Sequence, residues 1–223
     1  MRLNDLETRA SDVTIPRLIS EIRALAAGPL STQIENRIKE FAAIHLDGND
    51  VWFSELCFCI LTANSSARLG MRIQETLGAP GFLGLTKEEI AQRLRELGHR
   101  YSERRAVFIV TARNYQNIKD VVTRINNEKK AREWLADNVM GLGYKEASHF
   151  LRNVGYNNVA ILDRHVLRIM RDYGIIEEVP KALTKRMYIE YEERLTRLAI
   201  EVGMTLSRLD LYLWYMKTGA VLK

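Results

Sequence analysis

The sequence predicts an all-α protein. Apolar residues recur at helical spacing along most of the chain, segments with strand propensity are few, and the composition is that of a globular fold. Hydrophobic residues make up 47% and charged residues 27% of the 223 positions, which is typical of a domain with a buried core. The apolar segment 107–110 favours a strand by propensity alone, but its flanks are charged and helical in spacing, so we expect helix there too.

The first half of the chain contains two helices of different character. Segment 31–46 carries apolar residues at spacings of three and four, and Thr32-x-x-Glu35 predicts a capping box at its start. Segment 50–63 is apolar on nearly every side. Because a helix without a polar face must be surrounded by protein, this segment is expected at the centre of the fold.

Turn and capping residues mark where the next helices begin and end. Thr86-x-x-Glu89 predicts a second capping box, and Gly98 is expected to end that helix. The Gly-Ala-Pro-Gly stretch 78–81 is the expected loop before it. Further helices are expected at 102–113, 117–126, 128–139, 145–154, 163–173, 184–202 and 206–217.

One apolar segment of the second half is expected to be neither helix nor paired strand. Segment 159–162 follows the turn-forming residues 155–158 and directly precedes Asp163. We therefore interpret it as an extended connection that enters the core.

The chain is basic, with a formal net charge of +5 and a pI of about 9.2. Arginines concentrate in segment 93–113, and a second basic cluster lies at 164–171. This bias permits a nucleic-acid partner without proving one, because a solvated helix face is the alternative for either cluster.

Several classes of protein are excluded by the sequence. No apolar run approaches the roughly 18 residues of a membrane span, so no membrane partner is expected. The first residues lack the apolar segment of a secretory signal. Cys57 and Cys59 are too few for a disulfide framework, a zinc ribbon or a four-cysteine iron–sulfur cluster. We expect a cytoplasmic protein in a reducing compartment.

The most informative segment is a glycine-containing turn between two predicted helices. One helix ends near Met140, Gly141-Leu142-Gly143 follows, and the next helix begins near Lys145. Both glycines are free to adopt a positive φ, and such a turn directs backbone N–H groups and a helix N-terminus toward an anion such as a phosphate. The alternative is an ordinary corner between two helices, which also needs glycine.

Two titratable residues near this turn are candidates for catalysis. Lys145 lies at a helix N-terminus, whose positive end disfavours a second positive charge and so favours the neutral, nucleophilic amine. Asp163, eighteen residues later, could assist such an amine. The alternatives are a surface lysine and an aspartate that only caps the helix it precedes.

Together these segments resemble the helix-hairpin-helix DNA glycosylase superfamily. The matching residues are Met140-Gly141-Leu142-Gly143-Tyr144-Lys145 and Ile161-Leu162-Asp163. The chain is most similar to the short type-2 8-oxoguanine DNA glycosylase/AP lyases of archaea and some thermophilic bacteria. Met140 stands where the wider superfamily has proline, which pre-sets the turn but is not needed for the chemistry.

The resemblance implies further contacts with DNA. Segment 60–65 is similar to the helix-to-loop segment that fills the gap left by a flipped base, which singles out Asn64 and Ser65. A phosphate contact is expected from His165, for which a solvated helix position is the alternative. Backbone groups of Gly141 and Gly143 are also expected to contact DNA.

A base pocket is also implied by the resemblance. Segment 209–215 is similar to the last helix of the family, and this places Trp214 at the pocket wall. Tyr101 occupies a position where an aromatic residue is expected to stack on the extruded base. The printed sequence ends in Lys223, and a terminal lysine is a mark of this group that implies a role in recognising the base.

The resemblance also implies two helical lobes with a cleft, formed by about 1–48 with 164–223 and by about 49–127, and bridged by the hairpin motif at about 128–163. The implied activity is excision of 8-oxoguanine from duplex DNA through a Schiff base on Lys145, with help from Asp163, and then β-elimination at the abasic site. A nucleoid-associated prokaryotic enzyme is expected.

Two alternatives to this activity stay open at the level of sequence. A non-catalytic DNA-binding module could use the same hairpin, but it leaves the pairing of Lys145 with Asp163 unexplained. A glycosylase for another base lesion is the second alternative. No resident cofactor and no metal are expected for the proposed chemistry, although a monovalent or divalent cation held by hairpin carbonyls is compatible with it.

Overall fold

A computed structural model describes the backbone from residue 3 to residue 223 and the side chains from residue 14 onward. Met1 and Arg2, which belong to the segment examined for a signal sequence, lie outside the described residues. The helices are α1 (Leu3–Ala26), α2 (Leu30–Leu46), α3 (Asn49–Thr62), α4 (Ala67–Gly84), α5 (Lys87–Glu96), α6 (Ser102–Ala112), the 3₁₀ turn η1 (Arg113–Tyr115), α7 (Ile118–Thr123), α8 (Glu128–Asn138), α9 (Tyr144–Asn153), α10 (Arg164–Asp172), α11 (Lys185–Glu201) and α12 (Leu206–Thr218). Over this described range there is no strand, which confirms the predicted all-α class.

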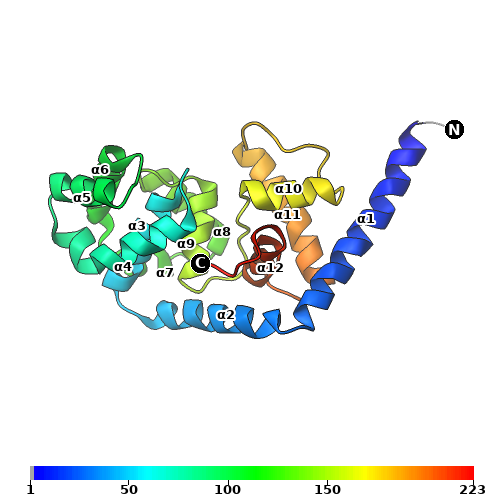
Figure 1. Cartoon of the computed structure of the whole chain (residues 1–223), viewed down its shortest axis with the longest axis horizontal. Helices are drawn as coiled ribbons and strands as arrows, with labels where there is room; N and C mark the ends of the chain where they lie inside the picture. The colour runs from blue at the N-terminus through cyan, green and yellow to red at the C-terminus, as the bar shows by residue number, and fades with distance from the viewer. Residues whose placement is uncertain (1–2) are drawn as a thin grey trace. The chain divides into compact units, whose positions relative to one another are not determined.

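The chain divides into two compact units (Figure 1). The first unit combines residues 1–39 with 157–221, and the second combines 40–156 with 222–223. The hairpin between α8 and α9 therefore groups with α3 to α7 in the second unit. None of the helices in the described part of the chain is both long and apolar enough to cross a bilayer.

Helix α3 forms the centre of the second unit. Every residue from Trp52 to Thr62 is buried, as the apolar pattern predicts. Helices α4, α6, α7 and α9 all pack against it. Gly70 permits the close approach of α4, because a Cβ there would lie 2.8 Å from Cγ2 of Thr62 and 3.0 Å from the ring of Phe58.

In the first unit, helices α1, α10 and α11 pack on α12. The segment 159–162 is extended and buried, which confirms its interpretation as a connection entering the core. Its backbone is fixed by two side chains of α11. Buried Glu192 accepts a hydrogen bond from the Ala160 N–H at 2.8 Å, and the Tyr188 hydroxyl donates to the Ala160 carbonyl at 2.7 Å. These bonds satisfy backbone groups that no sheet partner serves.

Two predictions about helix ends and loops are wrong. Helix α2 begins at Leu30, so Thr32 lies inside it and forms no capping box with Glu35. Residues 78–81 are not a loop, because helix continues on both sides and only Gly78 leaves helical geometry, with φ 56° and ψ −176°. Pro80 is tolerated there because it falls in the first turn after this break. The capping box of Thr86 with Glu89 is confirmed.

Candidate active site

The two glycines of the turn between α8 and α9, Gly141 and Gly143, have different conformations and roles. Gly141 has φ +93°, and a Cβ there would lie 2.5 Å from the Phe108 ring, so glycine is required both by conformation and by space. Gly143 was also expected to be free for a positive φ, but it is extended, with φ −98° and ψ −173°, because it is the N-cap of α9. Its N–H donates to Oε2 of Glu146 at 3.3 Å.

Lys145 is the second residue of α9. Its side chain is about one quarter exposed, and its Nζ lies 3.8 Å from Oε1 of Glu146. The buried face of α9 begins two residues after Lys145. The residues of α9 from Ala147 to Asn153 are all buried. Lys145 is therefore a partly exposed amine at the edge of a buried helix face, a position from which it can reach a substrate.

His149 lies in that wall, four residues after Lys145. Its ring packs edge-on against Phe58, with centroids 5.4 Å apart. Burial lowers the pKa of His149 well below its usual range, and the positive charges of Arg152 and Lys145 lower it further. His149 is therefore a neutral ring in the core, and it adds no charge beside Lys145.

Asp163 is the N-cap of α10 in the first unit. Its Oδ1 accepts a hydrogen bond from the Val166 N–H at 2.8 Å. The capping role is therefore confirmed, and it uses only one of the two carboxylate oxygens. The residue is partly exposed, and no hydrogen bond to Oδ2 is formed by the described residues. The pairing of Asp163 with Lys145, which belongs to the second unit, stays a prediction.

Trp214 and His165 meet within the first unit. The two rings are 4.9 Å apart between centroids and cross at 78°. Trp214 is half-buried, and its indole Nε1 is buried without a hydrogen-bond partner among the described residues. Buried indole N–H groups usually find an acceptor, so this donor lacks the partner that such a group normally has.

The loop between α3 and α4 carries Asn64 and Ser65. Asn64 is exposed and has φ +58°, a left-handed conformation that non-glycine residues seldom adopt. Two arginines hold the loop by its carbonyl groups. Arg100 donates to the Asn64 carbonyl at 3.0 Å, and buried Arg105 donates to the carbonyl of Ala63.

A hollow of about 580 Å³ lies between this loop, the start of α6 and the hairpin turn. Tyr101 lines it, with 39% of its surface exposed, and the Arg100 guanidinium lies 4.7 Å from the centre of its ring. The residues that line this hollow are Ala63, Asn64, Tyr101, Arg104, Arg105, Phe108, Met140, Gly141 and Glu146. The structure thus brings together three of the predicted residues, Asn64, Tyr101 and Gly141, around one basic hollow.

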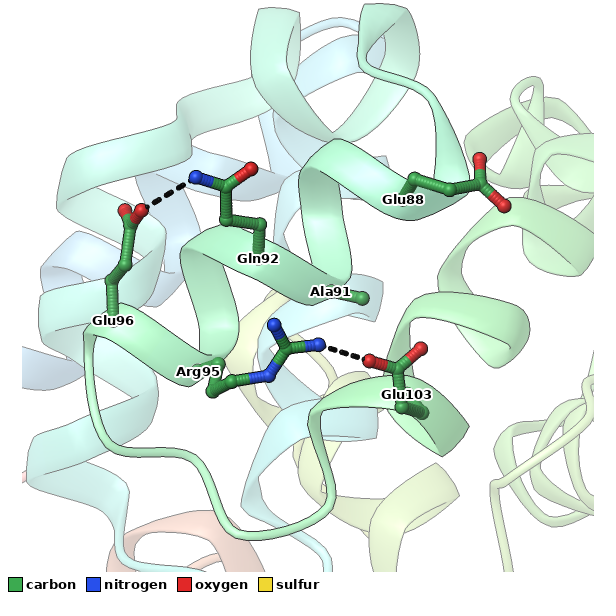
Figure 2. A pocket seen from close by; sticks show the side chains of 6 residues that line it. All are labelled: Glu88, Ala91, Gln92, Arg95, Glu96 and Glu103. Carbon is green, nitrogen blue, oxygen red and sulfur yellow. Dashed lines mark hydrogen bonds and ion pairs between the residues drawn. The ribbon is translucent and has the colours of Figure 1, made fainter.

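A second hollow, of about 540 Å³, lies on the surface of α5 and α6 (Figure 2). Its polar lining is mainly acidic, with Glu88 and Glu96, and Arg95 is neutralised by an ion pair with Glu103. Such a lining repels phosphate, so the basic hollow beside Tyr101 is the one that suits DNA.

Lys223 lies against α3. Its Nζ is 2.6 Å from Oε1 of Glu55 and 4.7 Å from the centre of the Phe58 ring. Sequence reasoning missed Glu55, although a signal was present, since it is the one acidic residue within the apolar run 51–63. A carboxylate in such a run is costly to bury unless it has a partner.

A helical fold with a glycine hairpin, a lysine on the first turn of the following helix and an aspartate capping a later helix defines the class of helix-hairpin-helix DNA glycosylases. The comparison with protein families gives a more particular result. A family model described as 8-oxoguanine DNA glycosylase matches residues 34–204. The chain therefore belongs to the 8-oxoguanine DNA glycosylase family.

Individual relatives agree with this assignment. An 8-oxoguanine DNA glycosylase/AP lyase from Methanocaldococcus jannaschii is 52% identical over 92% of this chain and 99% of its own length. The crystal structure of the glycosylase/lyase from that organism, in complex with a 15mer DNA containing 8-oxoguanine, has a TM-score of 0.91 at 51% identity and covers 93% of this chain and all of its own. The 8-oxoguanine DNA glycosylase of Thermotoga maritima has a TM-score of 0.88 at 42% identity, over 94% of this chain and all of its own.

Proposed function

We propose that this protein excises 8-oxoguanine from duplex DNA and then nicks the strand at the abasic site. The observation that carries the proposal is the position of Lys145, a partly exposed amine on the first turn of α9, directly after the hairpin turn. The relatives named 8-oxoguanine DNA glycosylase/AP lyase, which match nearly the whole chain, support it.

The proposed chemistry uses one nucleophile for both steps. The neutral amine of Lys145 attacks C1′ of the deoxyribose, and the bond from C1′ to the base breaks as the new C–N bond forms. The sugar ring then opens to a Schiff base. Loss of a C2′ proton and of the 3′ phosphate by β-elimination nicks the strand. Asp163 accepts a proton from Lys145 and stabilises positive charge on the sugar through its uncapped oxygen.

Binding to duplex DNA precedes this chemistry. C1′ cannot be reached inside the base stack, so the damaged nucleotide is flipped out. We assign Asn64 and Ser65, on their exposed loop, to the gap that it leaves. Backbone groups of the hairpin and His165 contact phosphates, which fixes the position of the DNA without reading its sequence.

The base pocket is proposed to contain Trp214, Lys223 and Tyr101. Trp214 offers a free indole N–H, and Tyr101 offers an exposed ring for stacking. A purine lesion presents both ring faces and hydrogen-bonding edges, so this combination suits it.

No step of this chemistry oxidises or reduces the substrate, so it requires no redox cofactor. Within the described residues no group of three or more histidine, cysteine or acidic side chains could hold a metal. We propose that any cation at the hairpin would be held by backbone carbonyls and would act on phosphate binding. A location in the cytoplasm, associated with the nucleoid, follows from the substrate.

The test is incubation with a duplex containing one 8-oxoguanine, in the presence of borohydride. Reduction of the Schiff base traps a covalent protein–DNA adduct, and we expect this adduct together with release of the base. Binding without an adduct or base release would instead indicate a non-catalytic binding module. An adduct only with duplexes carrying oxidised pyrimidines or alkylated purines would indicate a glycosylase for another lesion.

A further inference from the structure

Helix α3 buries a carboxylate, that of Glu55, at the centre of the second unit. Glu55 is 3% exposed and is the one acidic residue in the buried part of this helix, Trp52 to Thr62. A buried carboxylate persists only where charge and hydrogen bonds replace its lost water. Both of its oxygens are satisfied. Oε1 accepts from Lys223 Nζ at 2.6 Å and from Gln74 Nε2 at 3.0 Å, and Oε2 accepts from Asn153 Nδ2 at 3.0 Å.

The donors to Glu55 come from three separate parts of the second unit. Gln74 lies on α4 and Asn153 at the end of α9, and Gln74 is itself held by a contact to Ser54. Asn153 is fully buried. These two amides hold the Glu55 carboxylate in one orientation, independently of Lys223. Lys223 then pairs with an acceptor that is already in place.

The pairing fixes the last residue of the printed sequence. The Lys223 side chain is only 13% exposed, and its ammonium contacts Glu55 on one side and the Phe58 ring on the other. A lysine side chain has several freely rotating bonds, which the ion pair and the ring contact hold in one arrangement. The end of the chain accordingly lies beside helices of the second unit (Figure 1).

The same patch lies within electrostatic reach of the candidate nucleophile. Burial raises the pKa of the Cys59 thiol, the charge of Glu55 raises it further, and the positive charges of Lys145 and Lys223 oppose this rise. The buried thiol of Cys59 therefore experiences all three charged groups. Geometry places the pair there too, because Lys223 and His149 of α9 both contact the ring of Phe58.

We infer that Glu55 is a positioning residue for base recognition, which holds Lys223 at one place in the base pocket beside Lys145. The inference rests on the proposed function, in which Lys223 takes part in recognising the base. Glu55 is buried and acts through Lys223. Because its ammonium is already paired, Lys223 meets the base as a fixed ion pair, and fixed groups discriminate between similar bases better than mobile ones.

The experiment compares two substrates and two single variants with their double variant. Glu55→Gln removes the charge at constant shape, and Lys223→Met removes the ammonium while keeping an unbranched apolar chain. Single-turnover rates are measured for excision of 8-oxoguanine and for cleavage of a preformed abasic site, where no base has to be recognised. Glu35→Gln is the matched control, since it breaks another carboxylate pair, with Arg208 in the first unit.

We expect each single variant to lose about tenfold or more in excision and less than about twofold in abasic-site cleavage. The double variant should lose no more than the worse single variant, because the two residues act as one unit. Glu35→Gln should leave both rates unchanged. Glu55→Asp keeps the negative charge but moves it away from Lys223 by the length of one methylene group. It should show the same selective loss of excision, and it replaces Glu55→Gln as the test if that variant does not fold.

Three results would overturn the inference: unchanged excision in a folded Glu55 variant, equal losses on both substrates, or additive losses in the double variant. Equal losses would reduce Glu55 to a structural residue. Failure of the wild-type protein to excise 8-oxoguanine would be a different result, because it would remove the proposed function itself and the inference with it.

Discussion

At the scale of single residues, Lys145 is the group on which the proposed chemistry depends. Lys145→Gln should abolish adduct trapping and strand cleavage while leaving DNA binding close to normal. An amide cannot form an imine, but glutamine has a similar length and donates hydrogen bonds. Trapping with borohydride and a binding titration are measured on the same duplex. An adduct that persists in this variant would show that another amine is the nucleophile.

Asp163 combines a structural role with a proposed catalytic one, and one substitution separates them. Asparagine is also a good N-cap, so Asp163→Asn should keep the hydrogen bond to the Val166 N–H and the stability of α10. Excision should nevertheless slow by about 10²–10⁴-fold if the carboxylate moves a proton and stabilises charge. The rate is measured under single turnover, with thermal unfolding as the control for folding. Full activity would leave Asp163 with its capping role alone.

At the scale of elements, the hairpin turn depends on one glycine. Gly141→Ala places a Cβ at φ +93° and 2.5 Å from the Phe108 ring. We expect a loss of about 1–3 kcal/mol in the free energy of unfolding, from backbone strain alone, together with weaker DNA binding. Chemical denaturation and a binding titration measure the two effects.

The matched control for that turn is Gly84→Ala. Gly84 is the last residue of α4, and a Cβ there meets nothing within 4 Å. The control should therefore leave stability unchanged or raise it slightly, since alanine is the better helix former. If Gly141→Ala were as harmless as the control, the turn would not need its left-handed conformation.

Elements were predictable where the sequence carried a local signal. The all-apolar run of α3 and the capping box at Thr86 depend on residues close together in sequence, and both predictions were confirmed. Capping by Asp163, which the sequence offered as an alternative to a catalytic role, depends on neighbouring residues too and is observed. The wrong predictions, at Thr32 and Gly78, concern residues that often mark a helix boundary but lie here within helical segments. Packing against the rest of the unit decides such cases, and local sequence does not contain it.

The candidate site was predictable in part, for the same reason. Lys145 and the glycine turn form one contiguous motif, and so does the loop at Asn64. Contacts between residues far apart in the sequence could not be predicted from it. Glu55 meets Lys223 across 168 positions and Trp214 meets His165 across two helices. A family resemblance marked Lys223 and Trp214 as important, but only the fold shows what each of them touches.

At the scale of the whole molecule, the net charge of +5 makes the strength of DNA binding depend on salt. Each phosphate neutralised by a lysine or arginine releases condensed counterions, so the binding constant falls steeply as salt rises. We expect a loss of about 10-fold or more in affinity for duplex DNA between 50 and 200 mM salt, if several phosphates are contacted. Fluorescence anisotropy with a labelled duplex, at a series of salt concentrations, gives the slope of log affinity against log salt.

Two arginine variants connect this whole-molecule property to the basic hollow. Arg104 lines the hollow beside Tyr101, so Arg104→Gln should weaken binding to any duplex sequence and reduce the magnitude of the salt slope by about one. Arg93 is paired with Glu96 on α5, beside a surface that also carries Glu88 of α5 and Glu103 of α6, so Arg93→Gln should leave the slope unchanged. A slope that is flat in the wild-type protein, or equally altered by both variants, would contradict phosphate binding at this hollow. Both substitutions remove one positive charge, so the change in net charge is the same, and the expected difference comes from where each arginine lies and from the pairing of Arg93 with Glu96.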